Sequence, residues 1–278
     1  MNLSLLKSLY TIDAVKLIHH FPKTDSTNQR AKEDLRQFMD DEDRAENSVP
    51  ALYVADIQTA GRGRSGRAWT SDSEAGIWMS YLFAPKLSPE AISGVTLLAS
   101  LAVADAVTEY AERHNMSIGR VQIKWPNDII INGKKVCGIL TELVAPNYVI
   151  CGIGVNVSTV SFDNTLNDKA TSLFIETGET WSRETLVYLI IRKLTDLVSL
   201  YEKNQSLDFI IDKYNDYLVS MNSEVVIINN TSSGTGSADT YICRGIEKTG
   251  ALLIEDSSGR VSSVSSGEVS VRGVYGYV

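Results

Sequence analysis

The chain has 278 residues, which is enough for one large domain or for a large domain joined to a small one. Its formal net charge is −8 and its pI is near 5.0, which excludes a generally basic surface for nucleic acid. The hydrophobic content of 44% and the charged content of 22% are typical of a soluble globular protein, and we expect neither a membrane span nor a signal peptide.

Neither the cysteines nor the histidines form a pattern typical of a metal site or a catalytic triad. Cys137, Cys151 and Cys243 are widely separated and lack metal-binding spacing. Free cysteines are usually buried, and we therefore expect reduced thiols in a cytoplasmic protein. None of the three histidines lies near a nucleophile motif, so triad chemistry has little support.

Hydrophobic patterning predicts strands mixed with helices over the first 220 residues. Helices are expected after the capping residues 24–28 and at 92–114, 181–203 and 207–218. Strands are expected at 14–21, 51–57, 77–83, 121–125, 129–131, 135–143 and 148–155. The acidic stretch Met39–Asn47 lacks an apolar face, and we expect a solvated, mobile extension there.

The pattern changes near Met221. Five short strands follow, separated by clusters of Gly, Asn and Ser, at 224–228, 240–246, 251–254, 261–264 and 269–271. Short strands at this spacing are typical of a small barrel or sandwich. We therefore expect one domain over residues 1–220 and a second, small β domain over 221–278.

The segment Gly61–Arg67 alternates three glycines with three arginines and runs into Trp69. Glycine allows close approach of the backbone to a ligand, and arginine offers a planar fork of donors that fits phosphate or carboxylate. The segment therefore indicates a loop that closes over a charged anion and orders around it. A plain surface turn and an arginine motif for the minor groove of DNA are the alternatives.

Three further segments carry polar groups at the ends of expected elements. Lys124–Asp128 ends a hydrophobic strand with a lysine that could neutralise a carboxylate or a phosphate. Ser26, Thr27 and Asn28 begin a helix, where hydroxyl and amide groups can bind a ligand or simply cap the helix. Gly152–Asn156 places two glycines in a strand, which often marks a close approach of a ligand.

Taken together and in this order, these segments resemble the biotin–protein ligases. The resemblance also includes Lys135–Leu140, Ala170–Leu173, Gly250–Leu253 and Gly267–Arg272, and it extends from about residue 15 to the C-terminal region. It implies an α+β fold with a mixed β-sheet catalytic domain flanked by helices, similar to class II aminoacyl-tRNA synthetases, and a C-terminal SH3-like barrel. Only about twenty residues precede Asp25, so we expect a short form without the winged helix-turn-helix of many bacterial members.

The resemblance also implies a reaction and its partners. Biotin and ATP would form biotinyl-5'-AMP and pyrophosphate, and a lysine of a biotin carboxyl carrier domain would then take the biotin. Mg²⁺ is expected to arrive mainly with ATP, without a firm set of protein ligands. Neither DNA nor a membrane is an expected partner, and the resemblance leaves a monomer and a homodimer open.

The family motifs assign site residues as follows. The catalytic residues are Lys124, Arg62 and Arg64, and Lys124 is the strongest candidate because it would touch both the carboxylate and the α-phosphate. The biotin-binding residues are Ser26, Thr27, Asn28, Gln58, Arg62, Gly63, Arg64, Lys124, Gly138 and Gly154. The ATP- and adenylate-binding residues are Arg64, Arg67, Trp69, Lys124, Asn127, Asn156, Thr171 and Ser172. The alternatives are a lipoate–protein ligase and a nucleic-acid-binding module that uses the Gly/Arg loop.

Overall fold

The computed structural model describes residues 2–38, 41–144, 146–229, 239–265 and 269–273. Its centre is a seven-stranded sheet in the order β1-β2-β3-β7-β6-β5-β4. β1 and β2 run parallel and the other neighbouring pairs run antiparallel, so the sheet is mixed, as expected. The strands are β1 (Leu17–Thr24), β2 (Ala51–Gln58), β3 (Gly76–Phe83), β4 (Val121–Lys124), β5 (Asp128–Ile131), β6 (Lys134–Val144) and β7 (Tyr148–Asn156).

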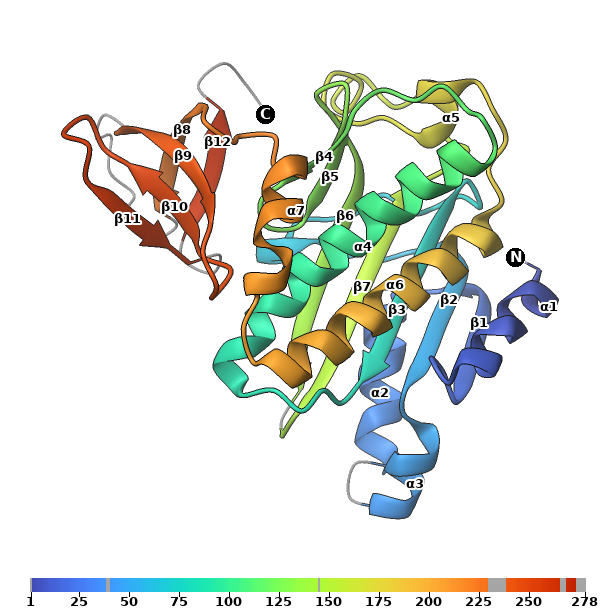
Figure 1. The fold of residues 1–278 in the computed structure, drawn as a ribbon. Helices are drawn as coiled ribbons and strands as arrows, with labels where there is room; N and C mark the ends of the chain where they lie inside the picture. The colour runs from blue at the N-terminus through green and yellow to red at the C-terminus, as the bar shows by residue number, and fades with distance from the viewer. Residues whose placement is uncertain (1, 39–40, 145, 230–238, 266–268, 274–278) are drawn as a thin grey trace.

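Helices cover both faces of this sheet (Figure 1). α2 (Thr27–Phe38) packs on one face against β2, β3 and β7, whereas α4 (Ile92–Arg113) and α6 (Arg183–Asn204) pack together on the other. Ala31, Leu35 and Phe38 recur at helical spacing on α2, and all three are buried. Two short helices follow the main sheet, α5 (Leu173–Thr177) and α7 (Ile211–Tyr217), and 3-10 turns occur at Arg64–Gly66, Pro89–Ala91 and Asp208–Ile210.

α4 matches the expected helix at 92–114 to within one residue. Together with the turn before it, Pro89–Arg113 is long and apolar enough to cross a membrane by length and composition alone. Most of this segment is buried, however, between the sheet and α6. A helix that is apolar all round is typical of the core of a large domain, and α4 has that position here.

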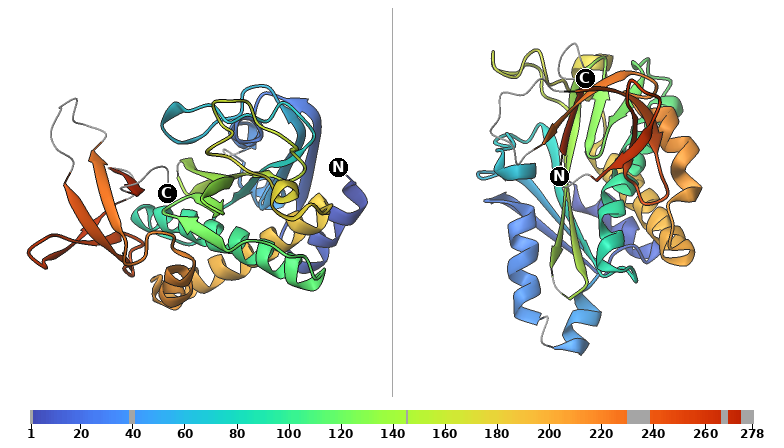
Figure 2. Two further views of the ribbon diagram at one scale, coloured as in Figure 1. Left: turned by 90° about the horizontal axis from the view of Figure 1, so that it is seen from above. Right: turned by 90° about the vertical axis from the view of Figure 1, so that its left-hand side faces the viewer.

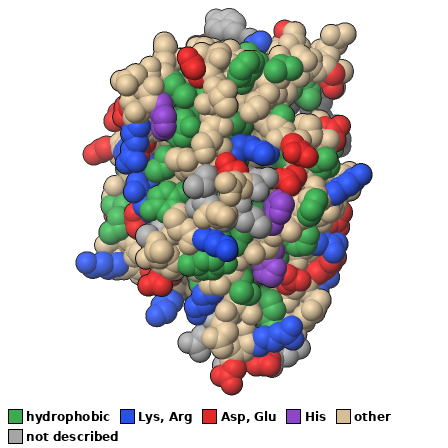
Figure 3. Space-filling view, turned by 90° about the vertical axis from the view of Figure 1, so that its right-hand side faces the viewer, with side chains coloured by type: hydrophobic (Ala, Val, Ile, Leu, Met, Phe, Trp, Pro, Cys, Tyr) green, Lys and Arg blue, Asp and Glu red, His purple; other side chains and the backbone are tan. Residues whose placement is uncertain are grey.

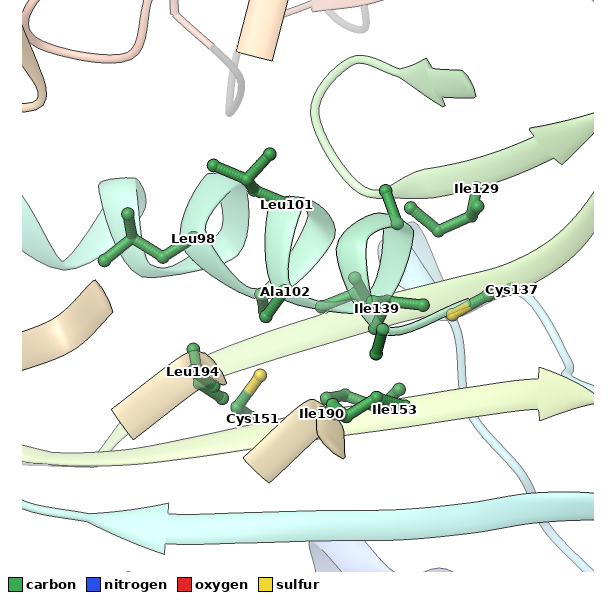
Figure 4. Close-up of a cluster of buried hydrophobic side chains, with 14 of the residues drawn as sticks. Leu98, Leu101, Ala102, Ile129, Cys137, Ile139, Cys151, Ile153, Ile190 and Leu194 are labelled. Carbon is green, nitrogen blue, oxygen red and sulfur yellow. The ribbon is translucent and has the colours of Figure 1, made fainter. Parts of the chain in front are cut away.

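Aliphatic side chains of α4, α6 and the central strands meet in one core (Figure 4). Leu98, Ile139 and Ile190 lie there beside two of the cysteines, Cys137 and Cys151. All three cysteines of the chain are buried and free, as the sequence predicted. The face of the molecule shown in Figure 3 carries acidic and basic side chains side by side rather than a patch of one sign.

The N-terminal region differs from the prediction. The helical turns α1 (Leu3–Leu6) and η1 (Lys7–Ile12) precede β1, which begins three residues later than the expected strand. Leu6 and Leu9 are fully buried in the main core, so they anchor these turns to the domain. Two buried leucines in a short stretch give too weak a hydrophobic periodicity to predict these helical turns from the sequence.

The acidic stretch is not the mobile extension that we expected. Glu42–Ser48 form the helix α3, whose N-cap Asp41 accepts a hydrogen bond from the backbone N–H of Arg44 at 3.1 Å. Ala45 and Val49 are buried in a second, smaller hydrophobic cluster between α2, α3 and the sheet. These two small apolar residues thus hold the helix against the domain. Residues 39–40 of the acidic stretch lie outside the described part of the chain.

A second sheet follows α7 and contains five antiparallel strands in the order β11-β10-β9-β8-β12, as expected for a small C-terminal β domain. It lies beside the β4 edge of the main sheet and next to α7 (Figure 2). The Trp125 indole N–H donates to the carbonyl of Gly250 at 3.1 Å, which ties the two sheets together. The strands are β8 (Glu224–Asn229), β9 (Thr240–Ile246), β10 (Leu252–Glu255), β11 (Val261–Val264) and β12 (Val269–Gly273).

Candidate active site

A cavity of about 480 Å³, including its mouth, opens over the centre of the main sheet. Concave sites that combine apolar walls with a few polar groups are typical of small-molecule sites. Its lining combines neutral hydrogen-bonding groups, three cationic side chains and a few apolar ones. The lining residues are Ser26, Thr27, Asn28, Gln58, Arg62, Gly63, Arg64, Trp69, Met79, Asn127, Lys135, Gly138, Ile139, Leu140, Gly152, Ile153 and Gly154.

The parallel pair of strands positions the neutral wall. Thr24 of β1 lies opposite Gln58 of β2, so both strands end at the same edge of the sheet. The carboxyl ends of parallel strands are a common place for ligands in α/β sheets. α2 begins there, and the Thr27 backbone N–H donates to Gln58 Oε1 at 2.8 Å. The sequence therefore brings a helix start and a strand end into contact across thirty residues of intervening chain.

Asn28 sits behind Thr27 with its amide held on both sides. Its Nδ2 donates to Glu142 Oε2 at 2.8 Å, and its Oδ1 accepts from Ser80 Oγ at 2.5 Å. A Cβ on Gly152 would lie 2.3 Å from Asn28 Oδ1, far inside van der Waals contact. Gly152 is therefore needed for the position of Asn28, although the sequence analysis assigned a site role only to its neighbour Gly154.

The two glycines that face each other across β6 and β7 make room for Trp69. Gly138 pairs with Gly154, and Cβ atoms on them would lie 2.9 Å and 2.6 Å from the Trp69 ring. These glycines thus contact the indole, whereas the sequence analysis assumed that they left room for the ligand directly. The indole Nε1 is buried and has no hydrogen-bond partner among the described residues.

Lys135 is the cavity cation that the sequence analysis missed. Its Nζ lies 2.7 Å from Asp128 Oδ1 and 5.0 Å from the centre of the Trp69 ring. It also lies 3.0 Å from where a Cβ on Gly138 would be, so both residues face the cavity. Residues three apart in a regular strand point to opposite faces. A register shift between Ile129 and Ile130 of β5, opposite this part of β6, changes that alternation.

Lys124, the strongest catalytic candidate from the sequence, does not line this cavity. It ends β4 at the edge of the sheet, where it pairs in register with Asp128. Its neighbour Asn127 does reach the cavity, with Nδ2 donating to the carbonyl of Ile139 at 3.0 Å. Asn127 is thus the residue of the segment 124–128 that lines the cavity, and Lys135 adds a positive charge beside Arg62 and Arg64.

The Gly/Arg loop forms a closed hairpin over the cavity mouth. The N–H of Gly63 donates to the carbonyl of Arg67 at 2.7 Å, and the N–H of Trp69 donates to the carbonyl of Gly61 at 2.9 Å. Ser65 turns the chain with a φ of 57°, in the left-handed region. Arg62, Gly63 and Trp69 line the cavity, whereas Arg67 is exposed and does not.

Arg64 is the most enclosed of the loop arginines. Its Nη1 donates to Asn127 Oδ1 at 3.0 Å. Burial lowers the pKa of its guanidinium from the usual value; the nearby charge of Asp128 opposes this effect, and that of Arg67 adds to it. A guanidinium stays charged under these conditions. The loop therefore holds a poorly hydrated cation at the cavity, and such a cation attracts an anion strongly.

Asn156, Thr171 and Ser172, which the sequence analysis assigned to the adenylate, lie outside the lining. All three are buried. Asn156 Nδ2 donates to the carbonyl of Thr171 at 3.0 Å, and Ser172 Oγ caps α5 by accepting from the N–H of Ile175. In the structure they hold the end of β7 against α5. No group of three or more His, Cys, Asp or Glu side chains that could hold a metal ion occurs among the described residues.

Residues 21–156 match the Biotin/lipoate A/B protein ligase family. The chain is 34% identical over 237 residues to the bifunctional ligase/repressor BirA of Bacillus subtilis, covering 82% of this chain and 68% of that protein. It is 30% identical to the biotin–[acetyl-CoA-carboxylase] ligase of Mycobacterium tuberculosis, covering 78% of this chain and 77% of that one.

The solved structures agree with the sequence relatives. The biotin protein ligase of Aquifex aeolicus in complex with biotin and ATP superposes with a TM-score of 0.75 at 29% identity, covering 93% of this chain and 99% of that chain. The mixed sheet with flanking helices and the small C-terminal sheet are therefore the biotin protein ligase fold. The chain belongs to the biotin/lipoate A/B protein ligase family as one of its biotin–protein ligases, and it is a ligase.

Proposed function

We propose that the protein activates biotin with ATP to biotinyl-5'-AMP and transfers the biotin to a lysine of a biotin carboxyl carrier domain. The observation that carries this proposal is the division of one cavity into a neutral hydrogen-bonding wall and a cationic end. Thr27, Asn28 and Gln58 form the wall, and Arg64 and Lys135 stand at the cationic end. A ligand that is neutral and polar at one end and anionic at the other fits this arrangement.

The neutral wall favours biotin over lipoate. A cyclic urea offers two N–H donors and one carbonyl acceptor, which match the hydroxyl and amide groups of Ser26, Thr27, Asn28 and Gln58. The dithiolane ring of lipoate offers neither, so it could form none of the hydrogen bonds that this wall offers a ligand. The apolar contacts of Met79 and the Trp69 ring suit the carbon skeleton of either ligand.

The cationic end supports the adenylation step. A carboxylate oxygen of biotin attacks the α-phosphorus of ATP, a P–O bond forms, and the bond to the β-phosphate breaks to release pyrophosphate. Two anions must meet in this step, so fixed positive charge lowers the barrier. Arg62, Arg64 and Lys135 supply that charge at the cavity. We assign the contact with the carboxylate and the α-phosphate to Lys135 in place of Lys124.

The second step needs a water-free site and an incoming amine. The carrier lysine attacks the acyl carbon of the mixed anhydride, a C–N bond forms, and AMP leaves. Until then the anhydride must be kept from water. We assign this shielding to the hairpin with Arg64 and Trp69, and a contact with the outer ATP phosphates to Arg67. Asn156, Thr171 and Ser172 support the wall behind the nucleotide.

Mg²⁺ fits this site as an ion carried by ATP. It prefers oxygen ligands and usually binds through substrate phosphates with one or two carboxylates. Asp128, the carboxylate beside Lys135, is the residue that would help to hold it. The bound ion would add charge neutralisation at the phosphates, to which the protein contributes the cations named above.

The direct test incubates the purified chain with ATP, labelled biotin and a biotin carboxyl carrier domain. Label should appear on the carrier lysine and not on a carrier with that lysine changed to arginine. A parallel reaction with labelled lipoate should give no product. Preferred transfer of lipoate would favour the lipoate ligase, and steeply salt-dependent DNA binding without any transfer would favour the nucleic-acid-binding module.

A further inference from the structure

A chain of hydrogen bonds runs behind the neutral wall of the cavity. It begins at Lys32 of α2, whose Nζ lies 2.6 Å from Glu142 Oε1. Glu142 Oε2 accepts from Asn28 Nδ2 at 2.8 Å, and Asn28 Oδ1 lies 2.5 Å from Ser80 Oγ. Ser80 Oγ lies 2.6 Å from Thr27 Oγ1, which faces the cavity. Lys32, Ser80 and Glu142 do not line the cavity themselves.

The charges at the outer end fix the direction of every proton in this chain. Glu142 forms an ion pair with the ammonium of Lys32, and a carboxylate can only accept hydrogen bonds. The Asn28 amide must therefore turn its NH₂ group to Glu142 and its carbonyl to Ser80. A hydroxyl has a single proton, and the carbonyl of Asn28 takes the proton of Ser80.

The direction then reaches the cavity through Thr27. The proton of Ser80 points to Asn28, so the short contact between the two hydroxyls requires that Thr27 donate to Ser80. The same hydroxyl could also donate to Gln58 Oε1, but that contact is 3.1 Å against 2.6 Å to Ser80 Oγ, so the Thr27 proton goes to Ser80. The remaining lone pairs of Thr27 Oγ1 therefore face the cavity as acceptors.

Burial makes this direction costly to reverse. Ser80 is fully buried, and Thr27 and Asn28 are buried almost as completely. Buried polar groups are nearly always paired, so a reversed chain would have to leave one of these atoms without a partner. Water cannot easily repair such a defect in a closed wall.

We propose that Ser80, Glu142 and Lys32 are positioning residues that make Thr27 an acceptor for an N–H group of the ligand. The proposal rests on the proposed function, because the ureido ring of biotin supplies that N–H. It adds specificity determinants that touch no ligand. Ser80, Glu142 and Lys32 act by fixing which atoms of the wall donate and which accept hydrogen bonds. The energy of the ion pair itself matters less for binding biotin.

The test compares binding of biotin by calorimetry, without ATP, to four variants. Glu142→Gln keeps the shape, but its amide oxygen turns to Lys32 and its NH₂ turns to Asn28, which forces the Asn28 amide to flip. Lys32→Met keeps the acceptor at Glu142. The double variant Lys32→Met/Glu142→Gln frees the new amide to turn its oxygen to Asn28. Ser80→Ala removes the link between Asn28 and Thr27.

Loss of the ion pair alone would not produce the changes in Kd for biotin that we expect for the four variants. Kd for biotin should rise about tenfold for Glu142→Gln and for Ser80→Ala, because one hydrogen bond to the ligand is lost. Lys32→Met should change little, and the double variant should recover most of the loss caused by Glu142→Gln. Glu255→Gln is the matched control, since Glu255 also pairs at 2.6 Å and is 26% exposed against 28% for Glu142.

Each other outcome points to one explanation. A double variant that binds no better than Glu142→Gln overturns the proposal, and so does a loss in Lys32→Met as large as in Glu142→Gln. Should Glu142→Gln fail to melt cooperatively, Ser80→Ala decides alone, and unchanged binding there overturns the proposal. A wild-type chain that does not bind biotin refutes the proposed function itself, which is a separate result.

Discussion

Replacing Lys135 with methionine keeps most of the side chain and removes its charge. The ammonium lies 2.7 Å from Asp128 and 5.0 Å from the centre of the Trp69 ring, so it is held in place before any ligand arrives. A fixed charge that meets developing negative oxygens typically contributes ~100- to 1,000-fold in rate. We therefore expect the single-turnover rate of adenylation to fall by that factor, equivalent to about 2.7–4 kcal/mol of transition-state stabilisation.

The fold should suffer much less than the rate. Asp128 loses one counter-ion, which we expect to cost on the order of 1–3 kcal/mol of unfolding free energy. The double variant Lys135→Met/Asp128→Asn should regain much of this stability without regaining the rate, because neither side chain is then charged. This contrast separates a loss of chemistry from a loss of folding.

Rapid-quench measurement of pyrophosphate at saturating biotin and ATP gives the rate. Lys124→Met is the matched control, since Lys124 also lies next to Asp128, with which it pairs in register, but lies outside the cavity lining. A rate for Lys135→Met within about fivefold of wild type would refute the reasoning. An equal loss in Lys124→Met would refute it as well and would restore Lys124 as the main cation.

Three further predictions follow from the cavity and the core. Gly154→Ala places a Cβ 2.6 Å from Trp69 Nε1, so the indole must move. We expect about a tenfold rise in KM for biotin in steady-state kinetics and a shift in tryptophan fluorescence. Unchanged values would count against the contact. Arg64→Gly should leave a folded protein that releases biotinyl-5'-AMP into solution, detected by chromatography, whereas full retention would contradict shielding by the loop. Burial raises the pKa of the Cys151 thiol to about 12 and that of Cys137 as well. Iodoacetamide at about pH 8 should therefore label neither thiol before unfolding, and mass spectrometry would reveal any early labelling.

The sequence predicted the sheet, the long helices and most of the cavity lining, because each of them leaves a local signal. Strand periodicity places β2 and β3, and the Gly/Arg loop follows β2 directly. The polar residues at the start of α2 follow a strand directly, so the sequence predicts that they lie at the carboxyl edge of the sheet, where ligands commonly bind.

Lys135 could not be found in this way, because its direction depends on pairing between strands. Alternation along β6 would place it on the face opposite Gly138, and the register shift opposite β5 reverses that. Our proposal to assign the catalytic charge to Lys135 in place of Lys124 rests on this placement. The position of Trp69 over Gly138 and Gly154 is likewise a tertiary contact, and glycines in a strand do not reveal which group approaches them.

The acidic helix α3 shows a second limit of local patterns. Its composition is typical of a solvated segment, and only Ala45 and Val49 give it a buried side. The apolar side chains that pack against these two residues belong to α2 and to the sheet. They are not part of the acidic segment, so its local pattern does not reveal them. Tertiary packing thus decides the structure here, as it often does for short helices.

The central claim is that one cavity brings a neutral polar ligand with a carboxylate tail against ATP. Exchange of labelled pyrophosphate into ATP, measured with the purified chain and no carrier, reports this step alone. The account predicts exchange that requires biotin, is not supported by lipoate, and disappears in Lys135→Met. Exchange that proceeds equally with lipoate, or none at all with biotin from a folded wild-type chain, would contradict it.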